Sequence, residues 1–107
     1  MNNNIVSQKM INLLGMAQKA NQLISGEFAI EKKIPEGRIR LLLVATDASE
    51  ASKRQYEKMA QTHEVPFAYA LSKEDLGQCT GKSYRAAVAV LDPGFSTALR
   101  KLLMPNS

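Results

Sequence analysis

A nearly continuous apolar run at residues 39–45, Ile-Arg-Leu-Leu-Leu-Val-Ala, constrains the fold more than any other feature of this sequence. A strand with one face in water alternates apolar and polar side chains, whereas a strand covered on both faces is apolar almost throughout. The run is therefore predicted to be a strand that is buried on both faces. A second hydrophobic run, residues 86–91, predicts another strand.

Helical and strand patterns alternate along the rest of the chain. Apolar residues at helical spacing predict a first helix over residues 5–20, and a short extended piece follows at Leu23 and Ile24. Similar patterns predict a strand at residues 65–71 and helices at residues 26–34, 47–62, 72–77 and 96–103. This alternation predicts an α/β fold, a three-layer α/β/α sandwich on a small mixed sheet.

Polar residues mark several predicted helix ends. Residues 47–49 offer capping oxygens to the third helix, and His63 is expected at its C-terminal end as an exposed cap. Ser72 and Asp75 have the spacing of a capping box at the next helix. Ser96 is expected to cap the last helix.

Length and charge limit the function. The 107 residues are expected to form one domain, with residues 1–4 as a flexible tail. Hydrophobic residues make up 45% and charged residues 22%, which is typical of a globular protein rather than a disordered one. The net charge of +4 favours an anionic partner, nucleic acid first, although a merely solvated basic surface is the alternative.

Several classes of protein are disfavoured by the sequence. Cys79 is the only cysteine, which excludes an internal disulfide and favours a reducing compartment. The polar N-terminal segment does not resemble a signal peptide, and no apolar run is long enough to span a bilayer, so we expect a soluble, cytoplasmic protein without a membrane partner. His63 is the only histidine, and we expect no metal, no cofactor and no catalytic residues.

Residues 76–95 nearly match a phosphate-binding P-loop, which requires four residues between two glycines and then Lys and Ser or Thr. Only three residues separate Gly77 from Gly81, and the strand follows the glycines instead of preceding them. What remains is a flexible basic turn with one aromatic ring, residues 81–85. Such a turn suits a nucleic-acid backbone better than a nucleoside triphosphate.

Two groups of segments together resemble a known family. The first is residues 26–32, Gly-Glu-Phe-Ala-Ile-Glu-Lys, with residues 37–47, and the second is residues 76–94 with their Gly-Lys-Ser-Tyr-Arg turn and Asp-Pro-Gly. In order and spacing they resemble the ribosomal protein L7Ae/L30e superfamily of kink-turn RNA binders, most closely its small bacterial YlxQ-like branch. The resemblance covers roughly residues 9–103.

The resemblance implies a non-enzymatic three-layer protein that grips RNA between the second helix and the loop before the last strand. Gly26 matches the family's glycine, whose backbone without a side chain lets RNA approach. Lys32 matches the lysine of the second helix that contacts RNA, and Asp47 lies at the corresponding strand end. A helix N-terminus and flexible basic side chains also suit phosphates on physical grounds alone. The expected RNA-binding residues are Gly26, Glu27, Phe28, Lys32, Lys33, Asp47, Lys82, Ser83, Tyr84 and Arg85, and Arg38 and Arg40 are expected to extend this patch.

The sequence departs from the family pattern at Phe28 and Ala29, where family members that read the kink carry a polar pair. These side chains cannot read base edges by hydrogen bonds, although Phe28 can stack on a splayed base. The simpler interpretation makes Phe28 a partly buried core residue and Asp47 a helix cap. For Lys32 and Lys33, the alternative interpretation is a run of solvated surface charges without a role in RNA binding.

The leading hypothesis is a non-catalytic, ribosomal or ribosome-associated protein that binds structured, kink-turn-like ribosomal or regulatory RNA. The alternative is a protein-interaction adaptor that keeps the fold but has lost specific RNA recognition, because an apolar pair at Phe28 and Ala29 also suits a protein interface. A small nucleotide-binding enzyme is a third interpretation, and it rests only on the imperfect Gly-Lys-Ser string. The leading hypothesis requires the segments at Gly26 and Gly81 to meet on one surface.

Overall fold

Within residues 3–103, five helices and four strands alternate in the predicted order. The structure is a computed structural model that describes residues 3–103. The elements are α1 (Asn3–Lys19), β1 (Leu23–Ser25), α2 (Glu27–Lys33), the 3-10 turn η1 (Ile34–Glu36), β2 (Leu41–Val44), α3 (Glu50–Thr62), β3 (Phe67–Tyr69), α4 (Lys73–Cys79), β4 (Ala87–Val90) and α5 (Pro93–Leu103).

The four strands form one mixed sheet in the order β1-β4-β2-β3. Strand β4 is antiparallel to both β1 and β2, and β2 is parallel to the edge strand β3. All four residues of β2 and all four of β4 are buried, as the apolar run at residues 39–45 predicts. The central strands are therefore covered on both faces.

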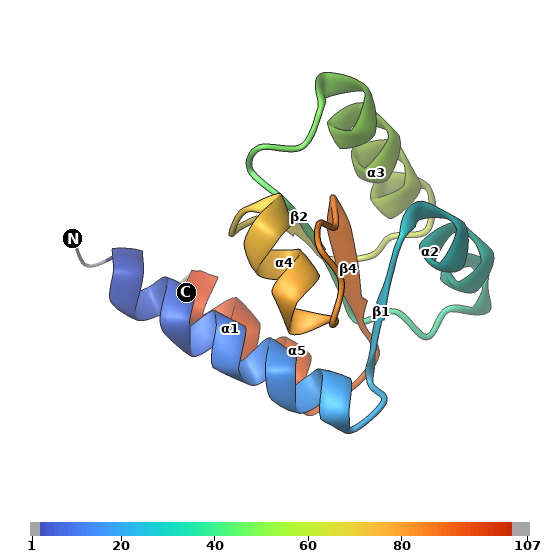
Figure 1. The fold of residues 1–107 in the computed structure, drawn as a ribbon. Coiled ribbons are helices and arrows are strands. Elements are labelled where there is room, and N and C mark those ends of the chain that lie inside the picture. Colours follow the sequence, from blue (N-terminus) through green and yellow to red (C-terminus); the bar gives the residue numbers. More distant parts are fainter. Residues whose placement is uncertain (1–2, 104–107) are drawn as a thin grey trace.

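The helices form a layer on each side of the sheet. Figure 1 shows α1, α4 and α5 gathered on one side of the strands, and α2 and α3 on the other. One hydrophobic core runs through all three layers, with Leu14 and Leu99 from one helical layer, Leu42 from the sheet and Ile30 from the other layer, each 0% exposed. The predicted three-layer α/β/α sandwich is confirmed.

The predicted helix caps are partly right. Ser72 accepts a hydrogen bond from the Asp75 N–H at 3.1 Å, as the capping-box spacing predicts. Of residues 47–49, only Ser49 caps α3. The expectation for Ser96 is wrong, because α5 already begins at Pro93, and the Asp92 carboxylate accepts from the Phe95 N–H at 2.9 Å.

Other boundaries differ from the sequence analysis near the ends and the sheet edge. Residues 3 and 4 belong to α1, so the expected tail is wrong there, and residues 1–2 lie outside the described residues. Strand β3 is shorter than residues 65–71, because Leu71 has a φ of +66°, which is incompatible with a strand. His63 is the exposed C-cap of α3, as expected. No helix within residues 3–103 has the length and apolarity needed to cross a membrane.

Candidate nucleic-acid interface

The strand register brings distant segments of the chain to one end of the sheet. Ser25, the last residue of β1, lies opposite Val88, and Val44, the last residue of β2, lies opposite Ala87. The start of α2, the segment after β2 and the loop before β4 therefore emerge at the same end. We call residues 25–28, 46–47, 72–73 and 81–85 the junction, together with Lys32, which lies one turn farther along α2.

Gly26 sits at the centre of the junction and has a backbone conformation that other residues rarely adopt. Its φ and ψ are 92° and 142°, and it is the N-cap of α2 without a side-chain cap. A Cβ placed on Gly26 would lie 3.9 Å from Cζ of Arg85. The two segments that the sequence predicts to meet are therefore in contact, although about 60 residues separate them along the chain.

Arg85 connects the loop before β4 to two other segments. Its backbone N–H donates to the Lys73 carbonyl at 3.0 Å, and its side-chain Nε–H donates to Ser25 Oγ at 3.1 Å. The residue is half-buried. These bonds use only one of the five guanidinium donors, so the side chain positions the loop against α2 and keeps donors for an anion.

Asp47 joins the end of β2 to the start of α4. Its Oδ1 accepts from the Lys73 N–H at 2.8 Å, so the carboxylate satisfies one of the free N–H groups of α4 rather than capping α3. Lys73 in turn accepts from Arg85 through its carbonyl. Asp47 is exposed.

Gly77 fixes the position of the loop, a role that the sequence analysis did not assign. A Cβ on Gly77 would lie 2.6 Å from the Ser83 carbonyl oxygen and 2.7 Å from the Tyr84 nitrogen. The Gly77 carbonyl also accepts from the Lys82 N–H at 2.8 Å. Only a residue without a side chain permits this approach of loop to helix. The sequence signal that could have indicated this role is an isolated glycine inside a helical pattern.

The exposed side chains of the junction are aromatic and basic. Phe28 is 78% exposed and Tyr84 is 64% exposed, so the expectation that Phe28 is a partly buried core residue is wrong. The reason is that Ile30, two positions later, points into the core from this short helix. Lys32, Lys82 and Ser83 are exposed as well.

Three of the other basic or acidic residues are placed less favourably for contact with an anion at the junction. Lys33 is engaged in an ion pair with Glu36 at 3.3 Å. Glu27 accepts from the Gln55 side-chain amide at 2.8 Å, which connects α2 to α3. Arg40 precedes β2 and therefore lies at the opposite end of the sheet, so the expected extension of the patch through Arg38 and Arg40 is wrong.

Two buried groups have raised pKa values. Burial, followed by the negative charge of Glu27, raises the pKa of Tyr56 to about 12, while Arg85 acts in the opposite direction. Burial, followed by the Asp75 charge, raises the pKa of Cys79 to about 11. A thiol with such a pKa is a poor nucleophile at neutral pH. Within residues 3–103, no group of three His, Cys, Asp or Glu side chains is arranged to hold a metal ion.

The junction combines features that bind anions and flat rings. Backbone N–H groups at the start of α2 and the flexible cations Lys32 and Lys82 suit phosphates. The two exposed aromatic rings offer faces for stacking.

Comparison with known proteins finds relatives that are RNA-binding or ribosomal proteins. The chain is 36% identical over 91 residues to the RNA-binding protein YlxQ of Bacillus subtilis (strain 168), an alignment that covers 85% of this chain and 91% of that protein. It is 32% identical over 96 residues to the RNA-binding protein YlxQ of Enterococcus faecium, covering 90% and 92%. It is 28% identical over 100 residues to the large ribosomal subunit protein eL8 of Thermoplasma volcanium, covering 92% and 83%.

Two solved structures share the fold. A protein of unknown function from Bacillus halodurans C superposes with a TM-score of 0.82 at 30% identity, covering 89% of this chain and 96% of that one. The Giardia lamblia 15.5kD RNA binding protein superposes with a TM-score of 0.75 at 17% identity, covering 92% and 84%. The profile of the ribosomal protein L7Ae/L30e/S12e/Gadd45 family matches residues 8–100. The chain therefore belongs to the ribosomal protein L7Ae/L30e/S12e/Gadd45 family.

Proposed function

We propose that this protein binds structured, kink-turn-like RNA through the junction, without catalysing a reaction, as a cytoplasmic protein of the ribosome or associated with it. The observation that carries the proposal is the hydrogen bond from Arg85 Nε–H to Ser25 Oγ at 3.1 Å, next to Gly26. It brings the start of α2 and the basic loop together, and these are the two segments between which members of this family are expected to hold RNA.

The exposed rings define how the junction selects its RNA. Phe28 and Ala29 offer no hydrogen bonds to base edges, and direct readout requires such bonds. Phe28 lies on the surface one helical turn before Lys32, so a base stacked on the ring has a phosphate-binding cation next to it. Unstacked bases occur where an RNA duplex is bent or interrupted. The proposed ligand is therefore an RNA that presents a splayed base beside a bent backbone.

A binding titration tests this proposal. The protein is titrated with a kink-turn RNA and with a plain duplex of the same length, each at several salt concentrations. The kink-turn RNA should bind more tightly, and its affinity should fall with increasing salt because bound phosphates release counterions. Failure of both RNAs to bind, or equal affinity for the two without a salt dependence, contradicts the proposal.

The protein-interaction adaptor is a second candidate, because one observation favours it. Ile24, Phe28 and Ala29, together with Lys32, Lys33 and Glu36, line a surface pocket of about 300 Å³. An apolar pocket with a charged rim also suits a protein side chain. Affinity capture with and without ribonuclease separates the candidates. Partners that persist unchanged after ribonuclease support the adaptor, and partners that disappear support RNA binding.

A further inference from the structure

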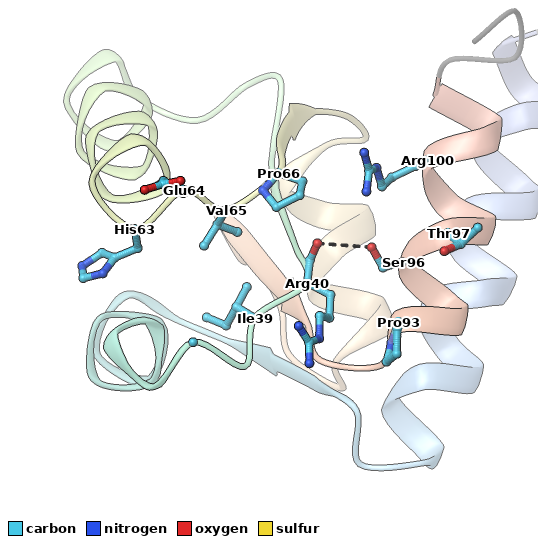
Figure 2. Close-up of a pocket in the computed structure, with 11 residues that line it drawn as sticks. Ile39, Arg40, His63, Glu64, Val65, Pro66, Pro93, Ser96, Thr97 and Arg100 are labelled. Carbon is cyan, nitrogen blue, oxygen red and sulfur yellow. Dashed lines mark hydrogen bonds between the residues drawn. The ribbon is translucent and has the colours of Figure 1, made fainter.

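A second candidate site lies at the end of the sheet opposite the junction. A pocket of about 310 Å³ opens between the start of β2, the end of α3 and the first turns of α5. We call it the arginine pocket. Figure 2 shows its lining residues: Gly37, Ile39, Arg40, His63, Glu64, Val65, Pro66, Pro93, Ser96, Thr97 and Arg100. None of them belongs to the junction.

Two arginines from different elements flank this pocket. The Arg40 carbonyl accepts a hydrogen bond from Ser96 Oγ at 3.2 Å, and the Arg40 N–H donates to the Val90 carbonyl at 2.7 Å. Figure 2 shows the side chains of Arg40 and Arg100 on opposite sides of the bond to Ser96. The backbone at Arg40 is thus fixed on both sides, while both arginine side chains are exposed.

The charge of the pocket is unbalanced. Within residues 3–103, neither Arg40 nor Arg100 takes part in an ion pair, because the two ion pairs there are Lys33–Glu36 and Lys53–Glu50. Glu64 is the only acidic residue among the lining residues. The nearby Asp92 uses its carboxylate to cap α5. Two guanidinium groups against one carboxylate give a local excess of positive charge, and a guanidinium matches phosphate geometry.

We propose that the arginine pocket binds phosphodiester groups of the same RNA, at a segment distant from the kink. This inference rests on the proposed function for its ligand, since an RNA held at the junction provides phosphates at high local concentration. The molecule measures 34 × 28 × 27 Å along its principal axes. An RNA that reaches from one end of the sheet to the other must therefore extend beyond a minimal kink along the protein surface.

Two RNAs separate this site from the junction. One is a minimal kink-turn, and the other is the same kink-turn with one helical arm lengthened by about one turn of duplex. In the double variant R40Q/R100Q, affinity for the long RNA should fall and its salt slope should decrease by about two, because two phosphate contacts are removed. Affinity for the minimal RNA should not change. Circular dichroism checks that the variant is folded.

The matched control is K9Q/K58Q, which removes the same charge from exposed positions that do not line the pocket. It should affect the two RNAs equally. If R40Q/R100Q behaves like this control, the effect is bulk charge and the inference is overturned. If the long RNA binds no differently from the minimal one in the native protein, the inference is overturned as well.

Nuclear magnetic resonance reports on the two sites separately. The Nε–H signals of Arg40 and Arg100 report on the pocket, and the backbone amide signals of Phe28 and Lys32 report on the junction. The long RNA should shift both sets, and the minimal RNA only the junction set. Pocket signals that move without junction signals would support the pocket while contradicting the proposed function. Pocket signals that move only with inorganic phosphate, or only with a peptide of ten glutamates, would overturn RNA as the ligand.

Discussion

At the junction, four segments that are distant in the sequence are connected by hydrogen bonds, whereas at the arginine pocket two side chains extend from elements that pack together in any case. Ser25, Asp47, Lys73 and Arg85 form one hydrogen-bonded series at the first end. At the second end, no hydrogen bond involving the Arg40 or Arg100 guanidinium occurs among the residues that the structure describes. The junction therefore depends on hydrogen bonds between segments of the fold, whereas the arginine pocket depends on two exposed side chains.

This difference separates two kinds of mutational effect. Substitutions at the junction change the backbone path, so they alter ligand binding even when the substituted residue touches no ligand. Substitutions at the arginine pocket remove charge and leave the backbone in place. The predictions below test this contrast, beginning with the largest expected effect.

Gly77→Ala should reduce affinity for kink-turn RNA by tenfold or more, about 1.4 kcal/mol. The new methyl group would lie 2.6 Å from the Ser83 carbonyl oxygen, so the loop must move away from α4. The free energy of unfolding should change less, because the strain of overpacking, about 1–3 kcal/mol, is offset by the helix propensity of alanine, about 1 kcal/mol. Isothermal titration and urea unfolding measure the two effects.

Gly15→Ala is the control for this substitution. Gly15 also lies in a helix, and a Cβ there would have no atom within 4 Å. The variant should keep its RNA affinity and gain up to about 1 kcal/mol of stability from helix propensity. An equal loss of affinity in Gly15→Ala and Gly77→Ala would show that the loop position is not the cause.

Phe28→Ala should cost about 1–3 kcal/mol of RNA-binding free energy if the ring stacks on a base. Because Phe28 is 78% exposed, the variant should be as stable as the native protein. Phe28→Leu distinguishes stacking from apolar contact, since it keeps the bulk and removes the aromatic face. RNA affinity that is lost in the Ala variant and restored in the Leu variant would indicate apolar contact with the RNA rather than base stacking. Fluorescence anisotropy with labelled kink-turn RNA measures these changes.

Lys32→Ala and Lys82→Ala should each weaken RNA binding and reduce the salt slope by about one. Both residues are exposed, so their effect is electrostatic and independent of RNA sequence. Lys33→Ala should have a smaller effect, because Lys33 is already paired with Glu36. Unchanged affinity in the Lys32/Lys82 double variant would contradict binding at the junction.

Most of the fold could be predicted because it depends on short-range patterns. The apolar run at residues 39–45 and the alternation of periodicities specify the strands and the layers. The errors in the predicted element boundaries and caps occur where tertiary contacts determine the local structure. Strand β3 is shortened because the left-handed Leu71 presents its carbonyl to both the N–H and the hydroxyl of Thr46. Ser96 is buried within α5, where it bonds to Arg40, because Asp92 takes the capping role that the sequence analysis gave to Ser96.

The residues of the candidate site came from the sequence, whereas their geometry did not. Gly26 and the loop at residues 81–85 were identified from their chemistry and from a family resemblance, and they do meet. Periodicity assigns Phe28 to a helix face but cannot show how short that helix is, so its exposure was missed. The role of Gly77 depends on a contact with the Ser83 and Tyr84 backbone. The sequence alone cannot show such a contact, because it depends on the three-dimensional position of the loop.

The smallest expected effect is on alkaline stability. Tyr56 and Cys79 are buried, and their pKa values are raised from 10.0 to about 12 and from 9.0 to about 11. The folded protein therefore holds both protons more tightly than the unfolded chain does, and stability falls wherever the unfolded chain loses them first. The contribution of these groups is complete below pH 9 and is lost progressively between pH 9 and 12. Tyr56→Phe should make this decline shallower in urea unfolding curves, and R40Q/R100Q should leave it unchanged, because the arginine pocket lies at the other end of the sheet. A decline that is identical in Tyr56→Phe and the native protein would remove Tyr56 as its source.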